Sequence, residues 1–253
     1  MALVLLSSGC VTNTKMSKSN AVESTQQKGP NLEKAARARL SLGIQYLKLG
    51  QVERAKHNFD KAMEHDSDLA AVQIGMGWYY ENVQEPEKAR KYYKRAIQLQ
   101  PNNGDNLNTY ASFLCTQDDY SAADKYYRKA ISQKGYANLA ATLENAGLCA
   151  QQSGALKLAE DYFSKALNHN PALPKTLLAL AQIRFKQQQY LNSRAYLERY
   201  SAAGKPTAQS LWLGIQIERI LGNKNALSSY QLQLVRLFPK SKEAKLYLSS
   251  VSK

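Results

Sequence analysis

Cysteine, histidine and tryptophan are scarce in this chain of 253 residues, which has three, three and two of them respectively. Cys115 and Cys149 have no Cys or His nearby at ligand spacing, which argues against a metal site. No His-Glu-x-x-His pair, phosphate-cradling glycine loop or nucleophile elbow is present. The sequence therefore predicts no catalytic residue, no metal and no other cofactor.

Long apolar runs and alternating apolar patterns are also missing. No segment approaches the roughly 20 apolar residues that a membrane-spanning helix needs. No stretch alternates between apolar and polar residues, which is the pattern of a half-buried strand. We therefore expect an all-α protein.

Acidic residues are outnumbered, with 20 Asp and Glu against 34 Lys and Arg and a net charge of +14. Nucleic-acid binding would need aromatic side chains among exposed basic ones, but the tyrosine pairs fall at packing positions, so we expect no nucleic acid. Basic residues recur at one position of a repeating pattern: Lys61, Arg95, Lys129, Lys165 and Arg199. They form an ordinary solvated face, a surface for anionic headgroups, which attract each basic residue by about 1 kcal/mol, or a surface for acidic patches on a partner.

A small residue recurs at intervals close to 34. The positions are Ala55, Ala89, Ala123, Ala159, Ser193 and Ala226. A period near 34 is typical of a repeated helix–turn–helix hairpin, which cannot bury its apolar face alone and must stack on its neighbours. The sequence thus predicts an α-solenoid with an extended concave surface.

Other positions of the period also share residue types. Gly or Ala stands twelve residues before the recurring small residue, and a large side chain stands four residues after it, as in Gly77, Ala89 and Tyr93. The small residues let two helices approach and the large one fills the space between them. The pattern resembles the tetratricopeptide repeat. It predicts an array over 32–253 with six units, at 36–69, 70–103, 104–137, 140–173, 174–206 and 207–240.

Departures from the period locate a loop and an end. The interval from Ala123 to Ala159 is 36, which places two extra residues near 135–139, between units three and four. Units five and six are degenerate, as terminal repeats are. After Pro239, Ser241 is expected to begin a capping helix over 241–252.

The first 31 residues differ from the rest. Residues 1–6 are apolar and three small residues precede Cys10. This is similar to the end of a bacterial lipoprotein signal, in which the cysteine is acylated; a frayed tail with a free thiol is the alternative. We expect a signal-peptide remnant at 1–9, lipid attachment at Cys10, and a flexible tether over 10–31 with a span of about 25 Å. Val11 after the cysteine, in place of Asp, favours the outer membrane.

Cys115 and Cys149 fall in the first helices of units three and four, which are stacked neighbours. In an oxidising compartment they could form a disulfide. Alternatively, they are two small buried residues that fill gaps between helices, as is common for cysteine. Both interpretations stay open.

Four positions of each first helix are expected to line the concave face. In units one and two most of these residues are apolar: Leu40, Ile44, Leu47, Ile74 and Trp78. Polar groove residues follow along the array: Glu81, Asn108, Ser112, Glu144 and Gln151. The apolar end suits an apolar segment of a partner, unless unit one simply packs on its neighbour. The polar part suits the backbone of an extended peptide.

Two stretches are more specific than the repeat itself. They are Asn108-Thr-Tyr-Ala-Ser-Phe-Leu-Cys115 and Glu144-Asn-Ala-Gly-Leu-Cys149. Together with Ala195-Tyr-Leu-Glu-Arg-Tyr200 and Cys10, they resemble the type IV pilus biogenesis lipoproteins of the PilF/PilW kind. The resemblance implies six repeats, an outer-membrane lipid anchor and action as a pilotin. A pilotin binds secretin subunits and promotes their outer-membrane localisation and multimerisation.

The resemblance, together with the N-terminal pattern, implies a non-enzymatic lipoprotein on the periplasmic face of the outer membrane of a Gram-negative bacterium. Its expected partner is the outer-membrane secretin of the type IV pilus, and its N-terminal acyl chains would hold a monomeric array at the membrane. The alternative needs only the generic repeat. It is a periplasmic scaffold for another envelope or secretion complex.

Overall fold

The computed structural model describes residues 30–251, which form thirteen α-helices and no strand. The helices are α1 (Pro30–Lys48), α2 (Val52–His65), α3 (Ala70–Asn82), α4 (Pro86–Leu99), α5 (Gly104–Thr116), α6 (Tyr120–Ile131), α7 (Leu139–Gln152), α8 (Leu156–His169), α9 (Pro174–Lys186), α10 (Tyr190–Ala203), α11 (Ala208–Leu221), α12 (Lys224–Leu237) and α13 (Lys242–Val251). The expected all-α solenoid is confirmed. The predicted signal remnant, Cys10 and almost all of the predicted tether lie outside the described residues.

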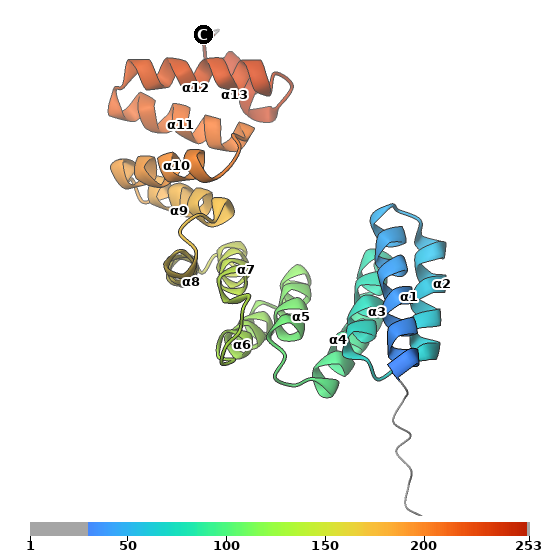
Figure 1. Ribbon diagram of the computed structural model, residues 1–253. Coiled ribbons are helices and arrows are strands. Elements are labelled where there is room, and N and C mark those ends of the chain that lie inside the picture. The colour runs from blue at the N-terminus through green and yellow to red at the C-terminus, as the bar shows by residue number, and fades with distance from the viewer. Residues whose placement is uncertain (1–29, 252–253) are drawn as a thin grey trace, which may run out of the picture.

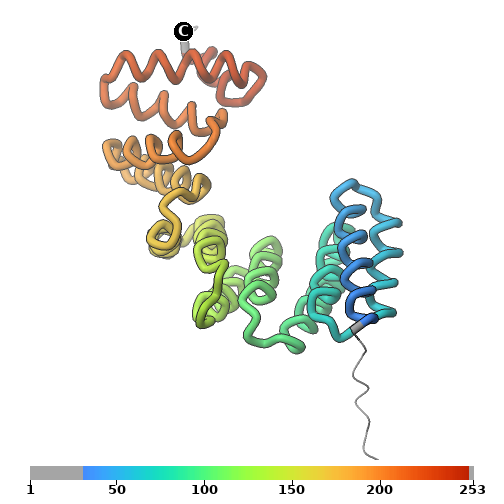
Figure 2. The backbone as a smooth tube through the Cα atoms, in the orientation of Figure 1, coloured from blue at the N-terminus to red at the C-terminus, as the bar shows by residue number. Residues whose placement is uncertain are grey.

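The helices stack in sequence order into a curved rod (Figure 1). Odd-numbered helices from α1 to α11 are the first helices of units one to six, and each packs on the even-numbered helix that follows it. First helices of adjacent units also contact each other, as α1 does α3 and α9 does α11. The tube in Figure 2 shows an N-terminal arm and a C-terminal arm joined by units three and four.

The small residues of the period let the paired helices approach. A Cβ atom on Gly77 would lie 2.5 Å from the Tyr93 ring, and one on Gly147 would lie 2.5 Å from the Phe163 ring. Ala89 and Ala159 are fully buried in the same hairpins. In unit five the equivalent residue is Ser193, whose hydroxyl is also fully buried and donates to the carbonyl of Ala181 at 2.7 Å. A polar residue is tolerated there because its donor has a partner.

The turn inside each hairpin repeats as regularly as the helices. Its left-handed residues follow the period: Gly50, Gln84, Asp118, Gly154, Gln188 and Gly222, with φ between 58° and 82°. Glycine adopts this conformation without steric cost, whereas other residues do so with some strain. The position therefore reverses the chain in every unit, even though only three units have glycine there.

The two extra residues lie in the connection between α6 and α7, as expected. The loop is held by Tyr136, whose ring covers Gly104 so closely that a Cβ there would lie 2.6 Å from the ring. The Tyr136 hydroxyl donates to Asp105 at 3.0 Å and lies 2.9 Å from the hydroxyl of Thr142. The insertion thus fastens unit three to unit four.

The first and last helices of the rod begin close to the predicted positions. Ser241 caps α13, since its hydroxyl accepts from the amide of Ala244 at 3.1 Å. Ala244 is fully buried and completes a small core with Leu211, Ile215 and Leu234. At the other end α1 begins at Pro30, two residues before the predicted start of the array. Proline is favoured in the first turn of a helix, so the end of the predicted tether is helical.

Candidate functional site

Two residues of the predicted apolar groove belong to the core. Leu40 is 9% exposed and occupies the space that a side chain at Gly75 would need. Ile74 is 7% exposed and packs in the central core of the rod. Leu40 is buried because Gly75 of α3 lets α1 approach closely. Neither side chain is open to a partner.

The other apolar groove residues lie nearer the surface. Ile44 and Leu47 are half-buried against the core of units one and two. Trp78 is exposed at 39%. Ile44 and Trp78 hold the same repeat position on the contacting helices α1 and α3. The structure therefore leaves a strip of Ile44, Leu47 and Trp78 at the N-terminal end of the array.

Glu81 is hydrogen-bonded within its own unit and to the next one. Its carboxylate accepts from the hydroxyl of Tyr93 at 2.7 Å and faces the hydroxyl of Thr116 at 3.5 Å. Burial, and then the hydrogen bond to this carboxylate, strongly raise the pKa of Tyr93. The phenol is thus held neutral as a donor to Glu81.

Units three and four use their polar groove residues in the same way. Asn108 accepts from the side chain of Asn145 at 3.2 Å, and Ser112 lies 3.0 Å from the hydroxyl of Tyr127. Glu144 accepts from the backbone amide of Thr176 at 3.2 Å and from its hydroxyl at 2.7 Å. Since Thr176 is in the first turn of α9, Glu144 caps that helix from the preceding unit. The bonds of Asn108 and Glu144 join neighbouring units, whereas the bond between Ser112 and Tyr127 joins the two helices of unit three.

Gln151 differs from the other predicted polar groove residues. It is half-buried near the end of α7, and its amide group makes no hydrogen bond to any described side chain or backbone group. It is therefore the predicted polar residue that the solenoid itself does not use.

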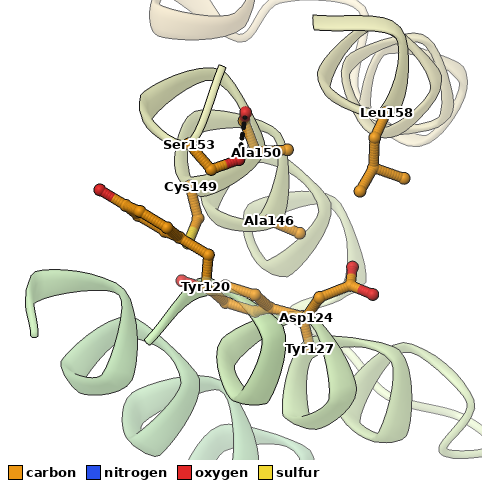
Figure 3. A pocket seen from close by; sticks show the side chains of 8 residues that line it. All are labelled: Tyr120, Asp124, Tyr127, Ala146, Cys149, Ala150, Ser153 and Leu158. Carbon is orange, nitrogen blue, oxygen red and sulfur yellow. Dashed lines mark hydrogen bonds between the residues drawn. The ribbon is translucent and has the colours of Figure 1, made fainter. Parts of the chain in front are cut away.

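Cys115 and Cys149 are joined by a disulfide between α5 and α7, with their Cα atoms 5.9 Å apart. Both half-cystines are buried. A small cavity of about 30 Å³ lies beside Cys149, and Figure 3 shows Tyr120, Asp124 and Tyr127 of α6 around it. A cavity of this size holds about one water molecule. The disulfide and its surroundings therefore serve the scaffold.

The basic row on the second helices is largely engaged within the chain. Lys61 pairs with Glu64, Arg95 with Asp68 and Lys165 with Asp161. Arg199 donates to the carbonyl of Pro171 at 3.3 Å. These contacts favour the interpretation of the row as an ordinary solvated face.

No chemistry-bearing cluster stands out among residues 30–251. That part of the chain has no group of three or more His, Cys, Asp or Glu side chains that could hold a metal ion. The described helices also include none that is both long and apolar enough to cross a bilayer.

One groove was missed by the sequence analysis. It lies between α9 and α11, in units five and six, and has a volume of about 360 Å³. Its lining residues are Gln182, Phe185, Lys186, Gln209, Trp212, Leu213 and Gln216. Their spacing of three or four residues along each helix places them on one face, which the sequence could have shown. The degenerate repeat pattern of units five and six makes the groove positions harder to assign there.

Comparison with known proteins places the fold in a family. The tetratricopeptide repeat model matches residues 70–103, which are unit two. The type IV pilus assembly protein PilF of Pseudomonas aeruginosa is 31% identical over 211 residues, which cover 83% of this chain and 84% of PilF. An uncharacterised protein of Haemophilus influenzae is 31% identical over 135 residues, covering 53% of this chain and 75% of that one.

Solved structures agree with this. The P. aeruginosa PilF structure superposes with a TM-score of 0.77 at 30% identity, covering 87% of this chain and 99% of that one. The structure of PilW, a type IV pilus biogenesis factor, gives a TM-score of 0.74 at 24% identity, with 84% and 98% covered. The chain therefore belongs to the PilF/PilW family of tetratricopeptide-repeat proteins of type IV pilus biogenesis.

Proposed function

We propose that this protein is a non-enzymatic lipoprotein that binds secretin subunits of the type IV pilus and promotes their localisation and multimerisation in the outer membrane. Membership of a family of type IV pilus assembly proteins supports a role in pilus biogenesis. The proposed anchor is an acylated Cys10, with the residues after it as a tether. Acyl chains contribute about 0.8 kcal/mol per buried methylene, so several chains on one cysteine would hold the array firmly.

The observation that carries the binding proposal is the exposure of Trp78. Trp78 is 39% exposed, and the half-buried Ile44 and Leu47 lie on the contacting helix α1, so apolar surface remains in water at this end of the array. Buried aromatic anchors dominate the energy of many protein interfaces. An apolar segment of a secretin subunit laid along α1 and α3 would cover this strip.

The binding test replaces Trp78 by Glu in the full chain carrying Cys10→Ser. Captured secretin subunits are measured in a pull-down, and circular dichroism and urea unfolding check that the variant folds. We expect capture to fall at least about tenfold, or about 1.4 kcal/mol. The control is Leu191→Glu, at a leucine of α10 that is 67% exposed, which should leave capture unchanged. A folded Trp78→Glu protein with normal capture would disprove the binding strip.

The anchor is tested separately by labelled palmitate. Cells producing the natural chain should incorporate the label and deliver the protein to the outer-membrane fraction. Cys10→Ser should abolish both. Label in the variant, or none in the natural chain, would contradict the proposed anchor.

A further inference from the structure

The groove between α9 and α11 differs from most of the predicted polar groove of units two to four because its amide groups are unused. In units two to four, Glu81, Asn108 and Glu144 are hydrogen-bonded within the array, and Asn108 and Glu144 bond to the next unit. By contrast, the side-chain amides of Gln182, Gln209 and Gln216 make no hydrogen bond to any residue in the described range 30–251. Each amide can donate and accept at once, as a peptide backbone can.

Two aromatic side chains lie among these amides. Phe185 of α9 and Trp212 of α11 are both half-buried and line the groove together with Leu213. The Phe185 ring is fixed by an edge contact to Tyr190, with ring centroids 5.5 Å apart. A half-buried pair of rings flanked by amides suits a peptide segment. Its apolar side chain would lie on the rings, and its backbone would bond to the amides on either side.

The groove is also basic at one end. Lys186 is in the last turn of α9 and Arg219 is in the last turn of α11. Arg219 continues the helical stripe of Gln209, Trp212 and Gln216 at spacings of three and four residues. Both basic side chains are exposed, and neither forms an ion pair with a carboxylate among the described residues. This end of the groove can therefore bind an anionic group of a ligand.

The charge of the surrounding units strengthens this end. Residues 174–251 have 12 basic and 3 acidic side chains, whereas residues 30–173 have 18 and 16. Of the three carboxylates, Glu218 is 3% exposed and accepts from Nε and Nη2 of Arg194, so it does little to offset the exposed charges. The net positive charge of residues 30–251 is therefore concentrated in the units that hold this groove, where it would steer an acidic ligand.

We propose that the groove between α9 and α11 binds an extended segment of a protein partner that carries an apolar side chain and carboxylates. The apolar side chain would lie between Phe185 and Trp212, the three glutamines would bond the backbone, and Lys186 and Arg219 would bind the carboxylates. This surface is separate from the strip around Trp78 and does not depend on the secretin proposal.

The test uses the full chain carrying Cys10→Ser and Trp78→Phe, in which Trp212 is the remaining tryptophan. The probe is a nine-residue peptide of alternating leucine and aspartate. Its binding is measured by the change in Trp212 emission. Peptides of the same length that alternate leucine with serine or with lysine are the comparisons. We expect the acidic peptide to bind at least about tenfold more tightly than either, a difference of about 1.4 kcal/mol.

Charge reversal decides where the peptide binds. Lys186→Glu with Arg219→Glu should weaken binding of the acidic peptide by about tenfold or more. Lys91→Glu with Lys94→Glu makes the same change in net charge on the exposed surface of α4 and should change binding much less. Equal losses in the two variants would overturn the proposal, as would an acidic peptide that binds no better than the serine one. Vesicles containing phosphatidylglycerol should leave Trp212 emission unchanged. If the vesicles shift the emission and displace the bound peptide, the basic surface binds a membrane and the proposal is overturned.

Discussion

Tyr136 shows how a single inserted side chain joins two units. Its ring fills the space above Gly104, and its hydroxyl bonds to Asp105 and Thr142. Burial first, and the hydrogen bond to the Asp105 carboxylate second among the raising effects, bring the pKa of Tyr136 to about 12. The phenol is therefore neutral in the folded protein at a pH where an unfolded tyrosine has already ionised.

This pKa predicts a pH dependence of stability. Because the folded-state value lies above the ordinary value of about 10, the contribution of Tyr136 is fully present below pH ~10 and is lost as the pH rises towards 12. The difference in free energy of unfolding between the natural chain and Tyr136→Phe should therefore shrink between pH 9 and 12. Urea unfolding of both proteins at several pH values measures it. A difference that stays constant with pH would show that the hydroxyl does not titrate as proposed.

Glu144 is a second residue whose role is decided by its contacts. It accepts two hydrogen bonds from Thr176 in the first turn of the next unit. Glu144→Ala should lower the free energy of unfolding by about 1–2 kcal/mol, as the loss of a helix cap does. Glu144→Gln keeps an acceptor oxygen and should lose less. Similar urea midpoints for Glu144→Ala and the natural chain would mean that the cap contributes nothing.

Among the structural elements, the hairpins were predictable and the links between them were not. The spacing of Gly77, Ala89 and Tyr93 predicted a packing that the structure confirms, because contacts within a hairpin recur at fixed positions of the repeat. The bond from Glu144 to Thr176 crosses between units, so the same residue could equally have faced a peptide. Periodicity places a side chain on a face of a helix but does not say which neighbour uses its polar atoms.

The disulfide is the covalent link between elements, and it closes a loop with a sequence separation of 34 residues. By the loop-entropy relation, such a crosslink stabilises the folded protein by about 3–4 kcal/mol. Replacing both Cys115 and Cys149 by Ala should lower the free energy of unfolding by about that amount. Adding reductant should destabilise the natural chain to a similar extent and leave the double variant unchanged. Reductant that destabilises both proteins alike would contradict this assignment.

For the whole molecule, stability is distributed along the rod. The buried residues fall into three successive clusters, and the last of them lies under α13. In a solenoid each unit contacts only its neighbours, so damage at one end should spread weakly to the other. The C-terminal end also holds Leu248 at the position where the first helices of all six units have Gly or Ala, so the small residue that lets paired helices approach is missing from α13.

Ala244→Asp tests this view of the molecule. Ala244 is fully buried between α13 and the core of unit six, so a carboxylate there would be desolvated without a partner and should detach the cap. We expect hydrogen exchange to become faster in α11 and α12 and to stay unchanged from α3 to α8, because the repeats are coupled only to their neighbours. Lys245→Asp places the same side chain on the exposed side of α13 and should change little. Faster exchange along the whole rod in Ala244→Asp would show instead that the array unfolds as one cooperative unit.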